Sequence, residues 1–368
     1  MRFTHSNPVE LLFGQGVLTD QAGRIRTLGS RALIVTGRTS ARASGILNEL
    51  TESLNNHAVQ WEIFDEVEEN PGFDVVARGA LYAGRFNADI IIGAGGGSPM
   101  DAAKAIAVLA GNPGLAVEEL LFPQKRTHLP VVCIPSTAGT GSEVTPYAIL
   151  TLEGLQTKSS LKCSIWPALS YVDTRYLHSM PPGVRCATCL DGLLHLMESA
   201  LSSRASFLSD AYAEKGLELV APLLPVLRQN RLDEQQWESL AASSVLGGMS
   251  IAQTGTTLPH GAGYLLTVRH GLAHGRATAL TAPVWLQIHP DQQKVGRLLA
   301  ILGMAAVEDF RETVRELAGP VRLELPSELL KSYAAELMNN GQKLANHPGP
   351  VTAGDLEAMY REATREDP

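Results

Sequence analysis

The residues whose types and spacing favour metal chemistry lie in the second half of this 368-residue chain. Asp191 and His195 are four residues apart in a segment of helical pattern, so both side chains project from one helix face. Three of the ten histidines, His260, His270 and His274, fall within fifteen residues further on. An Asp–His pair alone is common on helix surfaces, but a carboxylate with two or three neutral imidazoles suits Fe(II), Zn(II) or a related ion. The cluster therefore predicts a divalent metal acting as a Lewis acid on a carbonyl or alkoxide oxygen.

A glycine-rich run in the first half predicts phosphate binding. Gly95, Gly96, Gly97 and Ser98 follow a strand-like run and precede an Ala-rich helical segment. In this context a pyrophosphate can approach backbone N–H groups at the helix start. We expect Ser98 to be the N-cap, with Asp101 as a capping-box acid. Because Ser98 replaces the last glycine of G-x-G-x-x-G, a tight turn that needs only small residues is the alternative.

A second polar loop, residues 135–143, leaves the next strand-like run and carries several hydroxyl groups. Loops at the carboxyl ends of neighbouring parallel strands can enclose one cofactor, so we expect this loop to line the same crevice. A Ser/Thr-rich turn without a ligand is the alternative reading.

The residues after the first strand-like run bear on which nicotinamide cofactor binds. Gly37, Arg38 and Ser40 stand where an Asp or Glu would accept the ribose 2′-OH of NAD. Glycine, arginine and serine leave room, charge and a donor for a 2′-phosphate. This favours NADP(H) over NAD(H), although an arginine exposed after a strand is also common.

The order of elements predicts an α/β fold followed by an all-α part. Strand-like runs of the first half are Arg31–Thr36, Gln60–Phe64, Asp89–Ile92, Val131–Ile134 and Leu169–Val172. Expected helices include Met100–Ala110, Ser206–Arg228, Glu234–Met249 and Pro326–Asn339. We expect a Rossmann-like, parallel, doubly wound domain over residues 1–180 and an all-helical domain over residues 181–368, with the boundary near Met180-Pro181-Pro182.

Composition excludes several classes of protein. With 30 Lys+Arg against 38 Asp+Glu the net charge is −8, and aromatic residues make up 5%, which argues against a nucleic-acid-binding surface. Nowhere does an apolar run approach the length needed to cross a bilayer, and no export signal is visible, so a cytoplasmic enzyme is expected. The 4 cysteines do not make a disulfide framework, and we expect them reduced.

Several motifs together resemble the iron-containing (group III) alcohol dehydrogenases. They are Gly95 to Lys104 (GGGSPMDAAK), Pro135 to Thr145 (PSTAGTGSEVT), Met180-Pro181-Pro182 leading to Asp191-x-x-x-His195, then His260, His274-Gly275 and Asn346 to Thr352 (NHPGPVT). The resemblance implies a cleft between the two domains that holds a nicotinamide beside a divalent metal, and a homodimer. It implies the metal ligands Asp191, His195, His260 and His274, and a diphosphate loop at Gly95 to Ser98 with Asp101. Further cofactor contacts carry over to Asn70, Thr137, Thr140 and Lys158, with Lys162 as the alternative to Lys158.

This chain departs from the family at one position, because many members carry a second histidine four residues after the one that corresponds to His260. Tyr264 stands there, so the proton donor is expected to be Tyr264, His270, a ribose hydroxyl or water. The expected function is metal-dependent NAD(P)H aldehyde reduction and the reverse alcohol oxidation. The substrate is expected to be a small aldehyde, with an anionic one such as phosphonoacetaldehyde as a candidate because Lys162, Arg269 and Arg276 flank the metal segments. A dehydroquinate synthase-like lyase or cyclase is the alternative, and the ligand set with an aspartate and three histidines argues against it.

Overall fold

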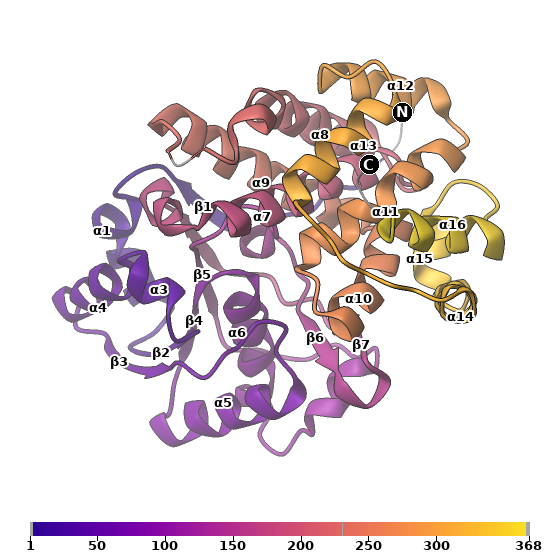
Figure 1. The fold of residues 1–368 in the computed structure, drawn as a ribbon. Coiled ribbons are helices and arrows are strands. Elements are labelled where there is room, and N and C mark those ends of the chain that lie inside the picture. The colour runs from indigo at the N-terminus through magenta and orange to yellow at the C-terminus, as the bar shows by residue number, and fades with distance from the viewer. Residues whose placement is uncertain (1–2, 230, 366–368) are drawn as a thin grey trace. The chain divides into compact units, whose positions relative to one another are not determined.

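The computed structural model describes residues 3–229 and 231–365, which form two compact units (Figure 1). The α/β unit comprises Asn7–Thr137 and Gly141–Met180. The helical unit comprises Pro181–Pro368 with Met1–Ser6 and the short loop segment Ala138–Thr140, as far as these are described.

A parallel sheet forms the centre of the α/β unit. In the described part of the chain it has six strands in the order β1-β8-β5-β4-β2-β3, and every neighbouring pair is parallel. The strands are β1 (Glu10–Phe13), β2 (Arg31–Thr36), β3 (Gln60–Phe64), β4 (Ile90–Gly95), β5 (Val131–Pro135) and β8 (Leu169–Val172). The expected parallel α/β fold is therefore confirmed. β6 (Ile149–Leu152) and β7 (Thr157–Ser160) form a separate antiparallel pair.

Helices cover both faces of this sheet because alternate strand residues point to opposite sides. Leu33 and Ile91 pack with the helices α5 (Phe73–Phe86) and α6 (Gly97–Ala110). Ile34 and Ile92 pack on the opposite face, which is covered by α1 (Val17–Gln21), α2 (Gly23–Leu28), α3 (Ser40–Ala43) and α4 (Ile46–Asn56). Four 3₁₀ turns complete the unit: η1 (Val117–Leu121), η2 (Ser142–Val144), η3 (Glu153–Leu155) and η4 (Thr174–Ser179).

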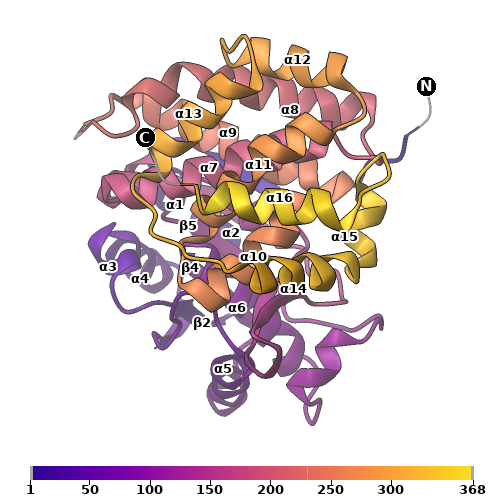
Figure 2. The ribbon, with the colours of Figure 1, turned by 45° about the vertical axis from the view of Figure 1, so that its right-hand side comes forward.

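The helical unit is built around one buried helix, α7 (Pro182–Ala200), which packs against α8, α9 and α11. Its remaining elements are α8 (Phe207–Val220), η5 (Ala221–Val226), α9 (Glu234–Thr254), α10 (Leu258–His270), α11 (His274–Ile288), α12 (Gln292–Ile301), α13 (Val307–Ala318), α14 (Ser327–Met338), α15 (Gly341–Asn346) and α16 (Ala353–Ala363). In Figure 2 the yellow α16 runs across α11, and α14 packs beside it. A Cβ atom at Gly275 would lie 1.8 Å from the Ala187 carbonyl oxygen, so only glycine lets the start of α11 approach α7 this closely.

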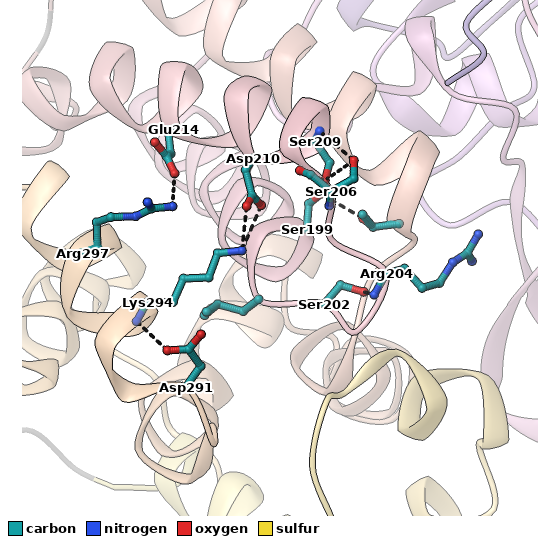
Figure 3. A network of polar contacts seen from close by, with 12 residues as sticks. Ser199, Ser202, Arg204, Ser206, Ser209, Asp210, Glu214, Asp291, Lys294 and Arg297 are labelled. Carbon is teal, nitrogen blue, oxygen red and sulfur yellow. Dashed lines mark hydrogen bonds and ion pairs between the residues drawn. The ribbon is translucent and has the colours of Figure 1, made fainter. Parts of the chain in front are cut away.

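Polar contacts fasten the outer helix α12 to α8 (Figure 3). Lys294 Nζ lies 2.9 Å from Asp210 Oδ2, and Arg297 pairs with Glu214. Asp291 caps α12 by accepting a hydrogen bond from the Lys294 backbone N–H at 2.9 Å. Ion pairs that remain partly exposed contribute about 0.2–1 kcal/mol each, so they hold α12 in place without dominating its stability.

Some expected boundaries are wrong for identifiable reasons. Helix α6 begins at Gly97 rather than Met100, and Ser98 does not cap it. The helix expected to end at Arg228 ends at Val220, because Pro222 and Pro225 turn the chain into the 3₁₀ segment η5. Among the described residues, no helix combines the length and apolarity that crossing a membrane requires.

Candidate metal centre and cofactor loops

Helix α7 places three acidic or imidazole side chains on one buried face. Asp191, His195 and Glu198 follow one another at spacings of four and three residues, which brings them to the same side of the helix. Asp191 is 4% exposed, His195 5% and Glu198 0%. Sequence reasoning missed Glu198, although its position seven residues after Asp191 could have indicated it.

Two further helices bring their first turns to this face. His260 is the third residue of α10 and is buried, and His274 is the first residue of α11. The Nε2 atoms of His260, His274 and His195 lie 3.4, 3.7 and 3.9 Å from Asp191 Oδ1. One oxygen and three ring nitrogens from four points of the sequence therefore surround one position.

The hydrogen bonds behind the rings of His195 and His260 decide which nitrogen of each ring faces this position. Gly139 O can only accept, so His195 Nδ1, 3.0 Å away, must carry the proton and donate. His260 Nδ1 likewise donates to the carboxylate Oε1 of Glu198. When both rings are neutral, each Nε2 presents a lone pair, and these two atoms are 2.9 Å apart. Either a proton on one of the two atoms or a cation bound beside both is needed to relieve this contact.

The donor set fits a divalent cation. Asp191 Oδ1 is buried and accepts no hydrogen bond from a described residue, although it faces the three imidazoles. Ligand atoms of Asp191, His195 and His260 all lie within 4.8 Å of one another. One carboxylate oxygen with neutral imidazoles is a set that Fe(II) and Zn(II) accept. The side chain of His274 is 23% exposed, so the site opens on that side, as a catalytic metal site must.

Burial and charge shift the pKa values of most of these groups in ways that suit the same reading. His260 is the exception, because burial would lower its pKa but the neighbouring carboxylates Glu198 and Asp191 raise it. Burial alone would raise the pKa of Asp191, but His195, His274 and His260 hold it well below its usual range. Burial lowers the pKa of His195, which favours the neutral ring that a metal needs. Burial would raise the pKa of Glu198, but His260 and the Lys343 charge lower it, so Glu198 stays ionised.

Tyr264 and His270, the two side chains expected to donate the proton, have different surroundings. The Tyr264 ring stacks on the His274 ring at 5.5 Å, and Lys343 Nζ lies 5.4 Å from the centre of the Tyr264 ring. His270 Nε2 is instead 2.8 Å from the Tyr333 hydroxyl on α14. Helix α10 ends at His270 and α11 starts only at His274, so these two histidines do not share a face of one helix.

The glycine run forms a cradle between hydroxyl groups in the α/β unit. Gly95 has φ +136°, and a Cβ atom there would lie 3.3 Å from Ser40 Oγ. A Cβ atom at Gly96 would lie 3.7 Å from Thr137 Oγ1. The Thr137 and Ser136 hydroxyls are buried and have no hydrogen-bond partner among the described residues. Gly97 begins the 14-residue helix α6, so a helix N-terminus lies beside these unpartnered hydroxyls, a combination that suits a diphosphate.

Two other expected cofactor residues are engaged within the protein. Asp101 accepts hydrogen bonds from Ser142 Oγ at 2.6 Å and from the Ile149 N–H at 3.0 Å, so its carboxylate fastens the second loop to α6. Ser98 Oγ accepts from the Asn70 N–H at 3.1 Å, which explains why it does not cap α6.

Lys104, which sequence reasoning missed, completes this fastening. Its buried Nζ donates to Ser142 O, Ser142 Oγ and Tyr147 O at 2.7 Å each and to Thr145 O at 3.0 Å. The amino group is therefore used entirely to hold the end of the second loop and the backbone that follows it.

Of the remaining expected cofactor positions, Thr140 belongs to the helical unit and the others to the α/β unit. Arg38 is exposed, and a Cβ atom at Gly37 would lie 2.9 Å from Val67 O, so a close backbone approach also accounts for glycine there. Lys158 lies on β7 and its charge acts on Asp101, whereas Lys162 is exposed and outside the strand. Thr140 is half-buried in the segment 138–140 of the helical unit.

Comparison with known proteins gives consistent matches over the whole chain. The family model described as iron-containing alcohol dehydrogenase matches residues 8–174, and the model described as Fe-containing alcohol dehydrogenase family, C-terminal, matches residues 185–364. The chain is 31% identical to lactaldehyde reductase of Escherichia coli K12 over 76% of this chain and 74% of the relative. It is 29% identical to sulfoacetaldehyde reductase of Bilophila wadsworthia over 94% and 96%. The crystal structure of an iron-containing alcohol dehydrogenase from Thermotoga maritima superposes with a TM-score of 0.91, at 36% identity and 99% coverage of both chains.

Proposed function

Because this chain belongs to the iron-containing alcohol dehydrogenase family, we propose that it reduces a small aldehyde to the alcohol with NADPH and catalyses the reverse oxidation. Membership of the family makes the protein an oxidoreductase and implies a divalent metal and a nicotinamide cofactor. The observation that carries the proposal is the buried Asp191 Oδ1 surrounded by the Nε2 atoms of three histidines.

Each group of the site has a task in this reaction. When bound, the metal supplies a Lewis acid for the substrate oxygen, and the nicotinamide supplies the hydride equivalent. Asp191 would hold the metal with one negative charge, and His195, His260 and His274 with neutral nitrogens. Because three ligands are buried, water would be excluded on all sides except that of His274.

We propose that Tyr264 holds the proton at its phenol oxygen, since its ring lies on the exposed ligand His274. His270 is the second candidate, and its bond to Tyr333 makes it the weaker one. Tyr264→Phe should then lower kcat while metal loading stays normal, and His270→Gln should change kcat less.

For the cofactor, we propose that the diphosphate binds Gly95, Gly96, Gly97 and the start of α6, close to Ser40 and Thr137. The lack of an acid after β2 and the exposed Arg38 support a preference for NADP(H). Asn70, Thr140 and Lys158 are proposed to line the nucleotide, and Asp101 to act by holding the loop. Arg38→Ala should raise KM for NADPH more than KM for NADH, and an equal effect on both would remove the proposed preference.

For the substrate, an anionic aldehyde remains a proposal, supported by similarity to a sulfoacetaldehyde reductase. Arg269 is a poor anion receptor because its guanidinium pairs with both oxygens of Glu336 at 2.8 and 3.1 Å. Lys343 is the better candidate, because its ammonium lies over the ring of Tyr264. Comparing kcat/KM for phosphonoacetaldehyde, sulfoacetaldehyde and neutral aldehydes of similar size tests the charge preference.

No observation favours the lyase alternative. Glu198, the additional buried carboxylate on this face of α7, binds His260 and Thr257 with its two oxygens rather than joining the ligand atoms. Net NADPH consumption distinguishes a reductase from a lyase that uses its nicotinamide transiently. The cytoplasmic location and the homodimer stay predictions.

The decisive experiment is an aldehyde screen in which the oxidation of NADPH or NADH is measured by absorbance. It compares protein stripped of metal by a chelator with the same protein reloaded with Fe(II) or Zn(II). We expect turnover in the reloaded protein and none in the stripped protein. Asp191→Asn should lose bound metal and turnover together. A fully active Asp191→Asn variant, or activity that is independent of metal, would refute the proposal.

A further inference from the structure

Glu198 is a buried carboxylate whose two oxygens are both committed to the start of α10. It is 0% exposed on α7. Its Oε1 accepts from His260 Nδ1, and its Oε2 accepts from the Thr257 backbone N–H and from Thr257 Oγ1, the latter at 2.9 Å. Burying a carboxylate is costly unless its lone pairs are satisfied, and here every contact leads to His260 or to the residue that precedes its helix.

These contacts fix two properties of His260. The bond to Oε1 keeps the proton on Nδ1, so Nε2 points its lone pair toward Asp191 Oδ1, 3.4 Å away. The bonds to Thr257 hold the first turn of α10, of which His260 is the third residue. The negative charge also lies at a helix N-terminus, where it is favourable.

A role limited to helix capping explains only half of this arrangement. Thr257 makes no side-chain cap bond to its own helix and gives its hydroxyl to Glu198 instead. If Glu198 served only the helix end, Oε1 would not need to reach the ring of His260.

We propose that Glu198 is a positioning residue that sets the tautomer and orientation of His260 and thereby the affinity of the site for its metal. The inference rests on the proposed metal centre. Groups that hold metal-bound histidines in this way typically contribute about 10- to 100-fold to metal affinity.

The test measures metal affinity rather than activity. Nucleotide-free protein competes for Zn(II) with a fluorescent chelator, and Glu198→Gln is compared with wild type. Glutamine keeps the shape but lacks the charge, and it cannot accept from both His260 and the Thr257 N–H. We expect affinity to fall about 10- to 100-fold.

A matched control separates this effect from lost stability. Glu362→Gln alters another buried glutamate of the helical unit, which pairs with Arg311 Nε at 2.9 Å. It should destabilise the unit and leave Zn(II) affinity unchanged. Thr257→Val should lower affinity less than Glu198→Gln, because the bond between His260 and Glu198 remains.

A second measurement uses the wild-type chain. In Co(II)-loaded protein, the Nδ1 proton of His260 should give a paramagnetically shifted NMR signal that exchanges slowly with water, because Glu198 holds it in a buried place. Wild-type affinity in Glu198→Gln, or rapid exchange of this proton, would overturn the inference. Failure of the wild type to bind metal would instead refute the proposed metal centre.

Discussion

The buried His347 should make this protein lose stability as the pH falls. His347 follows α15, is 4% exposed, and its Nδ1 accepts a hydrogen bond from Trp285 Nε1 at 3.3 Å. Since an indole nitrogen can only donate, the ring proton of neutral His347 is on Nε2, which has no hydrogen-bond partner among the described residues. Protonation of Nδ1 would make it a donor that faces the Trp285 N–H, so this hydrogen bond would be lost and two N–H groups would repel each other.

The size of the effect follows from the pKa. Burial, aided by His289 and opposed by Asp355, lowers the pKa of His347 from 6.5 to about 4. A folded-state pKa below the unfolded value means that the unfolded chain binds the proton first. Stability is therefore fully present above the unfolded pKa and is lost between about pH 6.5 and about pH 4. Between about pH 7 and about pH 5 this single group removes about 1.8 kcal/mol from the free energy of unfolding.

The assay compares His347→Asn with wild type by urea unfolding at both pH values. Asparagine offers Trp285 an acceptor and does not titrate, so the variant is less stable near neutrality, and its deficit should shrink by about 1.8 kcal/mol at the lower pH. His5→Asn, at an exposed histidine of the same unit, should show no such change in its difference from wild type. A constant difference between His347→Asn and wild type would refute the reasoning.

Three further substitutions have distinct expected outcomes. Lys104→Met should lower the free energy of unfolding by about 3–5 kcal/mol in urea titrations, since it leaves Asp101 and several buried acceptors without a cation; near-wild-type stability would contradict this account. Gly139→Ala places a Cβ atom 2.0 Å from Thr188 O, so the carbonyl that orients His195 must move. Zn(II) affinity should fall in competition titrations, and an unchanged value would count against a role for that carbonyl. Arg269→Ala should cost under about 1 kcal/mol and leave the kcat/KM ratio of anionic to neutral aldehydes unchanged; a collapse of that ratio would restore Arg269 as the anion receptor.

The sheet could be predicted from sequence where its strands consist mostly of β-branched and apolar residues. Arg31–Thr36 and Gln60–Phe64 are found as β2 and β3 with the expected ends, because runs of β-branched and apolar residues mark such strands. No expectation covers β1, a four-residue edge strand that begins with Glu10. The hairpin of β6 and β7 was also missed, because the half-buried β7 (TKSS) consists of polar residues that resemble a turn.

The candidate site was predictable in its ligands but not in the groups behind them. The helical spacing of Asp191 and His195 indicates that the two side chains lie together. That His260 and His274 join them was inferred from the resemblance to a family. The role of Gly139 is a backbone carbonyl, which no side-chain pattern reports. Asp101 could not be assigned from the motif alone, because its partners Ser142 and Ile149 lie more than forty positions away in the sequence.

The second loop shows why a single segment can look like a cofactor motif and serve two purposes. Thr137 turns a buried hydroxyl toward the glycine run, and two residues later Gly139 gives its carbonyl to His195. A side chain at Gly139 would collide with α7, so the glycine that permits a flexible phosphate loop is required here for packing against a helix. Its presence in the motif is thus explained by its contact with α7 and by the proposed metal centre, whereas the hydroxyl of Thr137 is explained by the proposed cofactor.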